Sequence, residues 1–149
     1  MLSSDFPLPD LDALPKLAKL IAPHLRAGDM LALTGDLGTG KTSFARALLQ
    51  LLGVSGDIPS PTFTLVQTYE ASGLLISHFD LYRLKSSAEL DELGWDDALA
   101  DGVTLVEWPE RAEGRLPADR LVLNFSILPS GARQCVIEPQ GNWRTRLAF

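Results

Sequence analysis

Hydrophobic and polar residues follow one another along the chain in blocks that predict helices and strands in turn. Between residues 11 and 25, apolar side chains recur at helical spacing, which predicts an amphipathic helix with Pro15 in its first turn. A short apolar run at residues 30–33 predicts a buried strand. Residues 43–52 again show helical spacing before a stop at Gly53. The first part of the chain therefore predicts a helix, a strand and a second helix.

Extended segments are more frequent in the rest of the chain. A helix is expected to begin near Ser86-Ser87 and to continue towards Asp101, and a short apolar strand follows at residues 103–106. Because helices alternate with strands, we expect an α/β fold with a central parallel sheet of the P-loop NTPase kind and antiparallel hairpin additions at its edges. The hairpins are predicted for residues 64–71 with 74–81 and for residues 120–128 with 133–137.

The clearest chemical signal lies between the first predicted strand and the helix after it. Residues 35–42 read G-D-L-G-T-G-K-T, which matches G-x-x-x-x-G-K-[ST] at every position. The glycines let backbone N–H groups turn inward around a phosphate chain, and the helix N-terminus adds the positive end of its dipole. Lys41 supplies a point charge, and Thr42 supplies a hydroxyl for Mg²⁺. This segment therefore predicts a P-loop that binds a nucleoside triphosphate.

Length and composition limit the number of domains and the kinds of partner that the protein can bind. The 149 residues fit a single domain with one substantial core, which we expect to span residues 1–149. The formal net charge of -6 argues against tight nucleic-acid binding by this chain alone, because such binding depends mainly on Lys and Arg at phosphates. The single cysteine, Cys135, lies in an apolar alternating segment and is expected to be buried. With no signal-peptide pattern and no long apolar run, we expect a cytoplasmic protein that does not enter a membrane.

Two further apolar strands each end in a carboxylate. The strand at residues 74–79 runs into Asp80, and the strand at residues 103–106 runs into Glu107. Beside a P-loop, one such group can hold Mg²⁺ with its water shell, while the other orients or deprotonates the attacking water. The pattern leaves open which residue has which role. His78 shares its side of the strand with Asp80, and we expect it to make a buried hydrogen bond rather than to act in catalysis.

A candidate switch loop lies at residues 60–64, which read Ser-Pro-Thr-Phe-Thr. The loop follows the P-loop helix and precedes the next strand, as the first switch loop does in P-loop nucleotidases. Ser60 and Thr62 are the candidate switch residues, and Thr62 could sense the γ-phosphate or Mg²⁺. The alternative is an ordinary turn whose geometry is fixed by Pro61.

Five segments form an ordered series that covers most of the chain. They are residues 35–44, Ser-Pro-Thr-Phe-Thr-Leu-Val at 60–66, His-Phe-Asp-Leu-Tyr-Arg-Leu at 78–84, Glu-Leu-Gly at 92–94 and Val-Glu-Trp-Pro-Glu at 106–110. Together they resemble the TsaE family, the bacterial tRNA threonylcarbamoyladenosine biosynthesis ATPase. A P-loop alone matches many unrelated proteins, but this combination is specific.

The resemblance implies a function that depends on partner proteins. It implies a small ATPase that uses ATP and Mg²⁺ and works with two partner subunits, the TsaB and TsaD proteins, in making threonylcarbamoyladenosine at position 37 of tRNA. The partners would carry the transfer chemistry, and ATP hydrolysis by this subunit would reset the complex between turnovers. The chain would then reach tRNA only indirectly, through the complex.

Several site residues follow from the resemblance. It implies that Thr42 and Glu107 form the magnesium pair and that Asp80 faces the nucleotide and its water. The adenine contact would fall at Pro9-Asp10-Leu11. Arg133 would be a basic residue near the nucleotide, and the alternative is that its side chain faces solvent. The candidate catalytic residues are Asp80, Glu107 and Lys41. The candidate nucleotide-binding residues are Leu11, Gly38, Thr39, Gly40, Lys41, Thr42, Ser43, Asp80, Trp108, Glu110 and Arg133.

Two rival functions belong to other classes. A small-molecule P-loop kinase would need a lid that carries arginines, whereas Lys85 is the only basic residue between Arg83 and Arg111. A nucleotide-gated binding module would show negligible hydrolysis, and the two carboxylates at strand ends argue against it. A GTPase is disfavoured because the sequence has no Asn-Lys-x-Asp segment of the kind that reads guanine.

Overall fold

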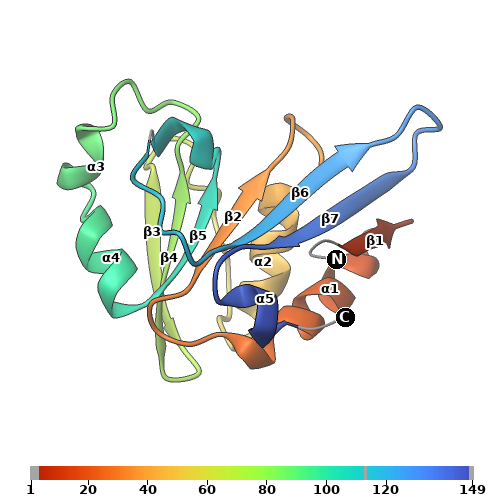
Figure 1. Cartoon of the computed structure of the whole chain (residues 1–149), viewed down its shortest axis with the longest axis horizontal. Helices are drawn as coiled ribbons and strands as arrows, with labels where there is room; N and C mark the ends of the chain where they lie inside the picture. Colours follow the sequence, from red (N-terminus) through yellow and green to blue (C-terminus); the bar gives the residue numbers. More distant parts are fainter. Residues whose placement is uncertain (1–3, 113, 148–149) are drawn as a thin grey trace.

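A seven-stranded sheet runs through the molecule in the order β1-β7-β6-β2-β5-β4-β3 (Figure 1). The computed structural model describes residues 4–112 and 114–147. The strands are β1 Ser4–Leu8, β2 Met30–Thr34, β3 Val66–Ala71, β4 Leu74–Asp80, β5 Val103–Glu107, β6 Leu121–Ile127 and β7 Arg133–Pro139. Neighbouring strands in the inner group β6-β2-β5-β4 are parallel, while β3 at one edge and β7 with β1 at the other pair antiparallel. The prediction of a parallel centre with antiparallel edges is confirmed.

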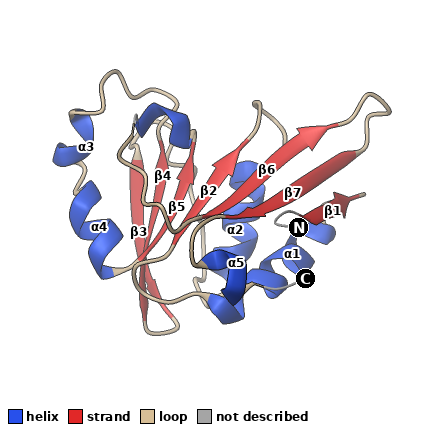
Figure 2. Ribbon diagram, in the orientation of Figure 1, coloured by secondary structure: helices blue, strands red, loops and turns tan. Residues whose placement is uncertain are grey.

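Helices cover the sheet on both sides (Figure 2). They are α1 Ala13–Ile21, α2 Lys41–Leu51, α3 Glu89–Glu92, α4 Trp95–Asp101 and α5 Trp143–Arg146, with short 3₁₀ turns η1 Ala22–His24 and η2 Pro109–Ala112. Pro15 lies in the first turn of α1, as predicted, where its missing N–H costs no helical hydrogen bond. None of the helices in the described ranges has the length and apolar character needed to cross a bilayer.

Each face of the sheet buries its own hydrophobic cluster. The first contains Leu17 of α1, Phe44 of α2 and Trp143 of α5, together with apolar residues of the strands. The second contains Phe79 of β4 and Trp95 of α4, whose ring centroids lie 5.0 Å apart at 71°. Full burial of a large apolar side chain contributes about 1.5–3 kcal/mol, so the two clusters hold the helices against the strand ends that carry the site.

The single long helix predicted from Ser86 towards Asp101 is wrong. The chain forms two short helices there, α3 and α4, separated at Gly94, whose φ of 73° lies in the left-handed region. The Ser86 hydroxyl accepts a hydrogen bond from the backbone N–H of Ala88 at 3.2 Å, which stabilises a turn before the first helix. The glycine and the serine both favour non-helical backbone. The prediction of one long helix relied on the acidic residues that follow Ser86 and did not take this into account.

Strand β1 is absent from the prediction based on the sequence. Its five residues include Pro7, which is unfavourable in a central strand but tolerated at an edge. Among the described residues, β1 pairs with β7 alone, placing Phe6 opposite Cys135 and Leu8 opposite Arg133. This pairing brings the N-terminal segment next to the P-loop.

Candidate functional site

The loop between β2 and α2 is forced into a sharp turn by its neighbours. A Cβ atom on Gly35 would lie 2.3 Å from the carbonyl oxygen of Phe125, so no other residue fits there without movement of the backbone. Gly40 is the N-cap of α2 and has a φ of 118°, in the left-handed region. The Thr39 hydroxyl donates to the carbonyl of Asp36 at 2.7 Å, which braces the loop. The predicted strand, glycine loop and helix are therefore present, and the helix N-terminus faces the turn, an arrangement that suits a phosphate chain.

Lys41 lies at the start of α2 with its side chain folded back over the loop. Its ammonium group donates a hydrogen bond to the carbonyl oxygen of Gly35, and its Nζ lies 3.6 Å from the ring centroid of Trp108. Burial lowers the pKa of Lys41, and the charges of nearby carboxylates, Glu107 first among them, oppose that shift. The lysine is thus a buried cation held among acidic and aromatic groups.

Glu107, at the end of β5, has both carboxylate oxygens engaged. The Thr42 hydroxyl donates to Oε1 at 2.8 Å, and Nε2 of His78 lies 2.7 Å from Oε2. Glu107 is only 2% exposed. Since a hydroxyl that donates its hydrogen still has free lone pairs, Thr42 and Glu107 together present oxygen atoms of the kind that Mg²⁺ prefers.

Asp80, at the end of β4, is linked to the candidate switch loop. Its Oδ1 accepts a hydrogen bond from the backbone N–H of Tyr82 at 3.0 Å, and its Oδ2 accepts one from the Thr62 hydroxyl at 3.2 Å. The hydroxyls of Thr62 and Ser60 lie 2.7 Å apart. A displacement of Thr62 would therefore break a contact with the Asp80 carboxylate.

Most of the predicted site residues line one cavity of about 210 Å³, which we term the polar cavity. Its lining comprises Leu37, Gly38, Gly40, Lys41, Thr42, Ser43, Thr62, Asp80, Tyr82, Glu107, Trp108 and Arg133. Tyr82 was not predicted, although it follows Asp80 by two residues. Its ring packs against that of Trp108, with centroids 4.9 Å apart and ring planes tilted by 50°. Residues from five separate segments therefore converge on one small volume.

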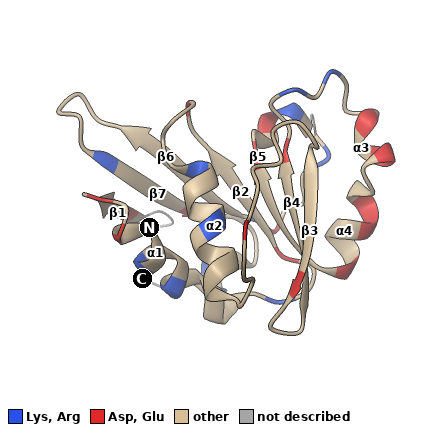
Figure 3. Cartoon of the chain, turned by 180° about the vertical axis from the view of Figure 1, so that it is seen from behind, with Lys and Arg blue, Asp and Glu red and all other residues tan. Residues whose placement is uncertain are grey.

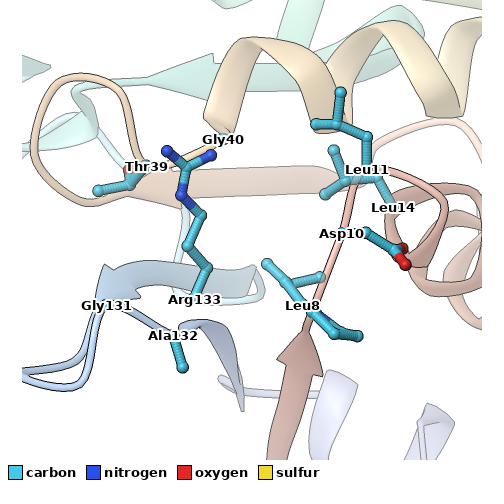
Figure 4. A pocket seen from close by; sticks show the side chains of 10 residues that line it. Leu8, Asp10, Leu11, Leu14, Thr39, Gly40, Gly131, Ala132 and Arg133 are labelled. Atoms are coloured by element: carbon cyan, nitrogen blue, oxygen red, sulfur yellow. The ribbon is translucent and has the colours of Figure 1, made fainter.

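A second cavity of about 470 Å³, the apolar cavity, adjoins the first, and Gly40 and Arg133 line both. Its lining comprises Leu8, Pro9, Asp10, Leu11, Leu14, Thr39, Gly40, Gly131, Ala132 and Arg133. Figure 4 shows the Arg133 side chain extending from β7 towards Thr39 and Gly40, while the Asp10 carboxylate turns away from it. Arg133 is exposed, yet it lies at the boundary of both cavities rather than away from the site.

Two predicted residues stand apart from these cavities. Glu110 is exposed on η2 and lines neither of them, although its charge acts on Lys41. Ser60 lines neither cavity and contacts the site through Thr62. In the apolar cavity, the sequence-based prediction missed Leu8, Leu14 and Ala132, which are apolar and carry no chemical signal in the sequence.

The donor set fits a magnesium ion that is shared with a nucleotide. Within residues 4–112 and 114–147, no group of three or more His, Cys, Asp and Glu side chains is arranged to hold a metal. Mg²⁺ in nucleotide sites usually takes one or two carboxylates, and substrate phosphates and waters complete its shell. The Thr42 hydroxyl and the Glu107 carboxylate, next to the glycine loop, match that pattern.

Comparisons with known proteins agree on one family. The family model described as "Threonylcarbamoyl adenosine biosynthesis protein TsaE" matches residues 8–135. A tRNA threonylcarbamoyladenosine biosynthesis protein TsaE from Rickettsia felis is 44% identical over 123 residues, which cover 82% of this chain and 72% of that protein. The protein of the same name from Bacillus subtilis is 37% identical over 127 residues, 85% of this chain and 79% of its own length.

A solved structure shares the fold over nearly the whole chain. The crystal structure of YdiB from Bacillus subtilis superimposes with a TM-score of 0.81 at 29% sequence identity. The match covers 98% of this chain and 93% of that one.

Proposed function

Because the chain belongs to the TsaE family, we propose that it hydrolyses ATP to ADP and phosphate in support of tRNA N6-threonylcarbamoyladenosine formation. The observation that carries the proposal is the convergence of the P-loop with Asp80 and Glu107 on one cavity. The parallel inner strands, with the loop between β2 and α2, support a fold of the P-loop NTPase kind. The volume of the adjoining apolar cavity supports a nucleotide that extends from one cavity into the other.

The residues divide the work of phosphoryl transfer to water. The N–H groups of residues 38–42 and the ammonium of Lys41 bind and neutralise the phosphates. Thr42 and Glu107 would hold Mg²⁺, which would neutralise negative charge on the phosphate oxygens. Asp80 accepts a hydrogen bond from the attacking water and orients it towards the γ-phosphorus.

The switch loop reports the state of the nucleotide. Thr62 donates to Asp80 and lines the polar cavity, so a γ-phosphate there competes for the same hydroxyl. Release of phosphate after hydrolysis frees Thr62 and changes the loop that carries the exposed Phe63. Thr62→Ala is expected to retain nucleotide binding and to lose the stimulation of repeated tRNA modification by the partner subunits. Full stimulation by that variant would refute the switch.

Protein partners, rather than tRNA, provide the attachment. The net charge is -6, and acidic side chains gather on α3 and α4, where they repel RNA phosphates (Figure 3). Because the resemblance to the TsaE family implies TsaB and TsaD as partners, we propose that tRNA is bound through a complex with them, and we propose the cytoplasm as the location. The isolated chain is expected not to shift tRNA in an electrophoretic assay at physiological salt. A shift at sub-micromolar protein would refute indirect binding.

Reconstituted tRNA modification tests the proposed function. Purified TsaB and TsaD, with their substrates and tRNA, are supplied with the wild-type chain or with Glu107→Gln. The wild-type chain should let modified tRNA accumulate beyond one equivalent of the partner pair, and Glu107→Gln should stop near one equivalent. If both proteins support repeated turnover equally, hydrolysis is not the function of this site, and the nucleotide-gated binding module becomes the better assignment.

A further inference from the structure

His78 is buried on β4, beside the candidate metal site. The side chain is 0% exposed, and its Nε2 lies 2.7 Å from Oε2 of Glu107. The other oxygen of that carboxylate accepts from Thr42. One histidine and one hydroxyl therefore each contact a different oxygen of Glu107.

The strand register accounts for this contact. In the parallel pair of β4 and β5, His78 stands opposite Leu105, and Asp80 stands opposite Glu107. Residues two apart on a strand share a face, so His78 reaches diagonally to Glu107 from one side, while Asp80 stands directly across from it. The diagonal reach joins two elements that lie far apart in the sequence.

The chemistry of the pair defines which nitrogen carries the hydrogen. A carboxylate oxygen accepts hydrogen bonds, so the 2.7 Å contact assigns Nε2 of His78 as the donor to Glu107. Nδ1 is buried and has no hydrogen-bond partner among the described residues. A hydrogen placed on Nδ1 alone would leave that donor unpaired and would turn the lone pair of Nε2 towards a carboxylate oxygen, which is unfavourable on both counts.

We propose that His78 is a positioning residue that orients Glu107 for magnesium binding. The inference rests on the proposed ATPase function. With Oε2 fixed by His78, the carboxylate cannot rotate away from Thr42, and Oε1 stays at the side of the cavity where the metal and the phosphates meet. Hydrogen bonds that orient metal ligands in this way typically change metal affinity by about 10–100-fold when they are removed. Asp80 has no such anchor in the sheet, since its two oxygens accept from Tyr82 and Thr62 in the loops.

Metal affinity, measured without turnover, tests the proposal. Bound Mn²⁺ is read by electron paramagnetic resonance in the presence of a saturating non-hydrolysable ATP analogue. His78→Leu keeps the bulk of the side chain and removes the donor, whereas His78→Gln places an amide N–H near the same position. Thr104→Val is the matched control, because it removes a buried polar group from β5, away from the carboxylates.

The three variants should differ in their affinity for Mn²⁺. His78→Leu should lower the Mn²⁺ affinity of the nucleotide complex by about tenfold, while His78→Gln and Thr104→Val stay close to wild type. Unchanged affinity in His78→Leu overturns the role, and so does an equal loss in all three variants. If the wild-type chain binds neither nucleotide nor Mn²⁺, the proposed function itself fails and the inference with it.

A second measurement decides the matter if His78→Leu does not fold. Nitrogen-15 spectra of the wild-type protein report which imidazole nitrogen carries hydrogen. The proposal requires hydrogen on Nε2 of His78. The effect of the Glu107 contact on the nitrogen-15 signal of Nε2 should then disappear in Glu107→Ala. Hydrogen on Nδ1 alone would overturn it, because Nε2 could then not donate to the carboxylate.

Discussion

The polar and apolar cavities share Gly40 and Arg133 but are built in opposite ways. The polar cavity lies where parallel strands end, and its charged residues Lys41, Asp80 and Glu107 are buried and hydrogen-bonded. The apolar cavity lies at the edge of the sheet, between β1, α1 and the turn after β6, and leucines contribute much of its lining. Under the proposed function, the hydrogen-bonded network at the strand ends would set the rate of reaction, whereas the apolar cavity at the edge of the sheet would fit the rest of the nucleotide.

This contrast has a kinetic consequence. Changes in the polar cavity should alter the rate of hydrolysis and leave affinity largely intact, because the groups there act most strongly on charge that develops in the transition state. Changes in the apolar cavity should alter affinity and leave the rate of the bound complex intact.

Loss of Lys41 should have the largest effect. Lys41→Ala removes the buried cation at the phosphates and should lower turnover by about a thousandfold, the range seen for the loss of one strong electrostatic contact. The rate of phosphate release and the midpoint of thermal unfolding are both measured. The midpoint should stay close to that of the wild type. Lys19→Ala, an exposed lysine of α1, is the control. A folded Lys41→Ala variant with normal turnover would contradict the P-loop assignment.

The two carboxylates should come next. Glu107→Gln and Asp80→Asn should retain nucleotide binding and lower turnover by at least about a hundredfold, the lower end for general-base action. Titrating Mg²⁺ separates their roles, since Glu107→Gln alone should weaken magnesium binding. The reverse pattern would exchange the roles, and lost binding with an unaffected rate would make both residues structural.

Filling the apolar cavity should have a moderate effect on affinity only. Ala132→Trp places an indole where Leu8 and Leu14 line the space and should weaken ATP binding by about tenfold, or about 1.4 kcal/mol, with kcat unchanged. Ser130→Trp, in the same turn but outside the lining, is the matched control. A fall in kcat at saturating ATP would show that the two cavities do not divide the work.

The preference for adenine over guanine should be a smaller effect than the loss of ATP affinity in Ala132→Trp. The apolar lining offers few polar groups to read guanine, and the sequence has no Asn-Lys-x-Asp segment, so ATP should bind more tightly than GTP. Competitive titration of the two nucleotides measures the preference. Equal affinities would mean that the base lies outside this cavity.

Tryptophan fluorescence should give the smallest signal. Trp108 is partly exposed and lies under the Lys41 ammonium, whereas Trp95 and Trp143 are fully buried. When Lys41 turns to the phosphates, it leaves the Trp108 ring, so nucleotide addition should change the emission of that residue. Trp108→Phe should abolish the change, and its persistence in that variant would contradict the movement of Lys41.

The polar cavity could be predicted because its parts are local. The P-loop at residues 35–42 and the acids at strand ends, Asp80 and Glu107, can each be recognised within a few consecutive residues. The contact between His78 and Glu107 could not be foreseen, since it depends on the register of β4 against β5. A buried hydrogen bond was expected for His78, but its partner was not.

The apolar cavity could not be predicted for a related reason. It requires β1 to pair with β7, a long-range contact with no local signature, and Pro7 argues against a strand when the segment is considered alone. Of its lining, only the segment around Leu11, together with Thr39, Gly40 and Arg133, was anticipated, and Leu11 and Arg133 came from the family resemblance. Apolar side chains such as Leu8 become part of a site only through tertiary packing.

The most direct test is ATP turnover by the purified chain, alone and with TsaB and TsaD. The account predicts slow, magnesium-dependent phosphate release by the chain alone, faster release when both partners are added, and loss of both rates in Glu107→Gln. Phosphate release that stays at background with the partners present, although the chain binds ATP, would contradict the claim that the two cavities form an ATP-hydrolysing site.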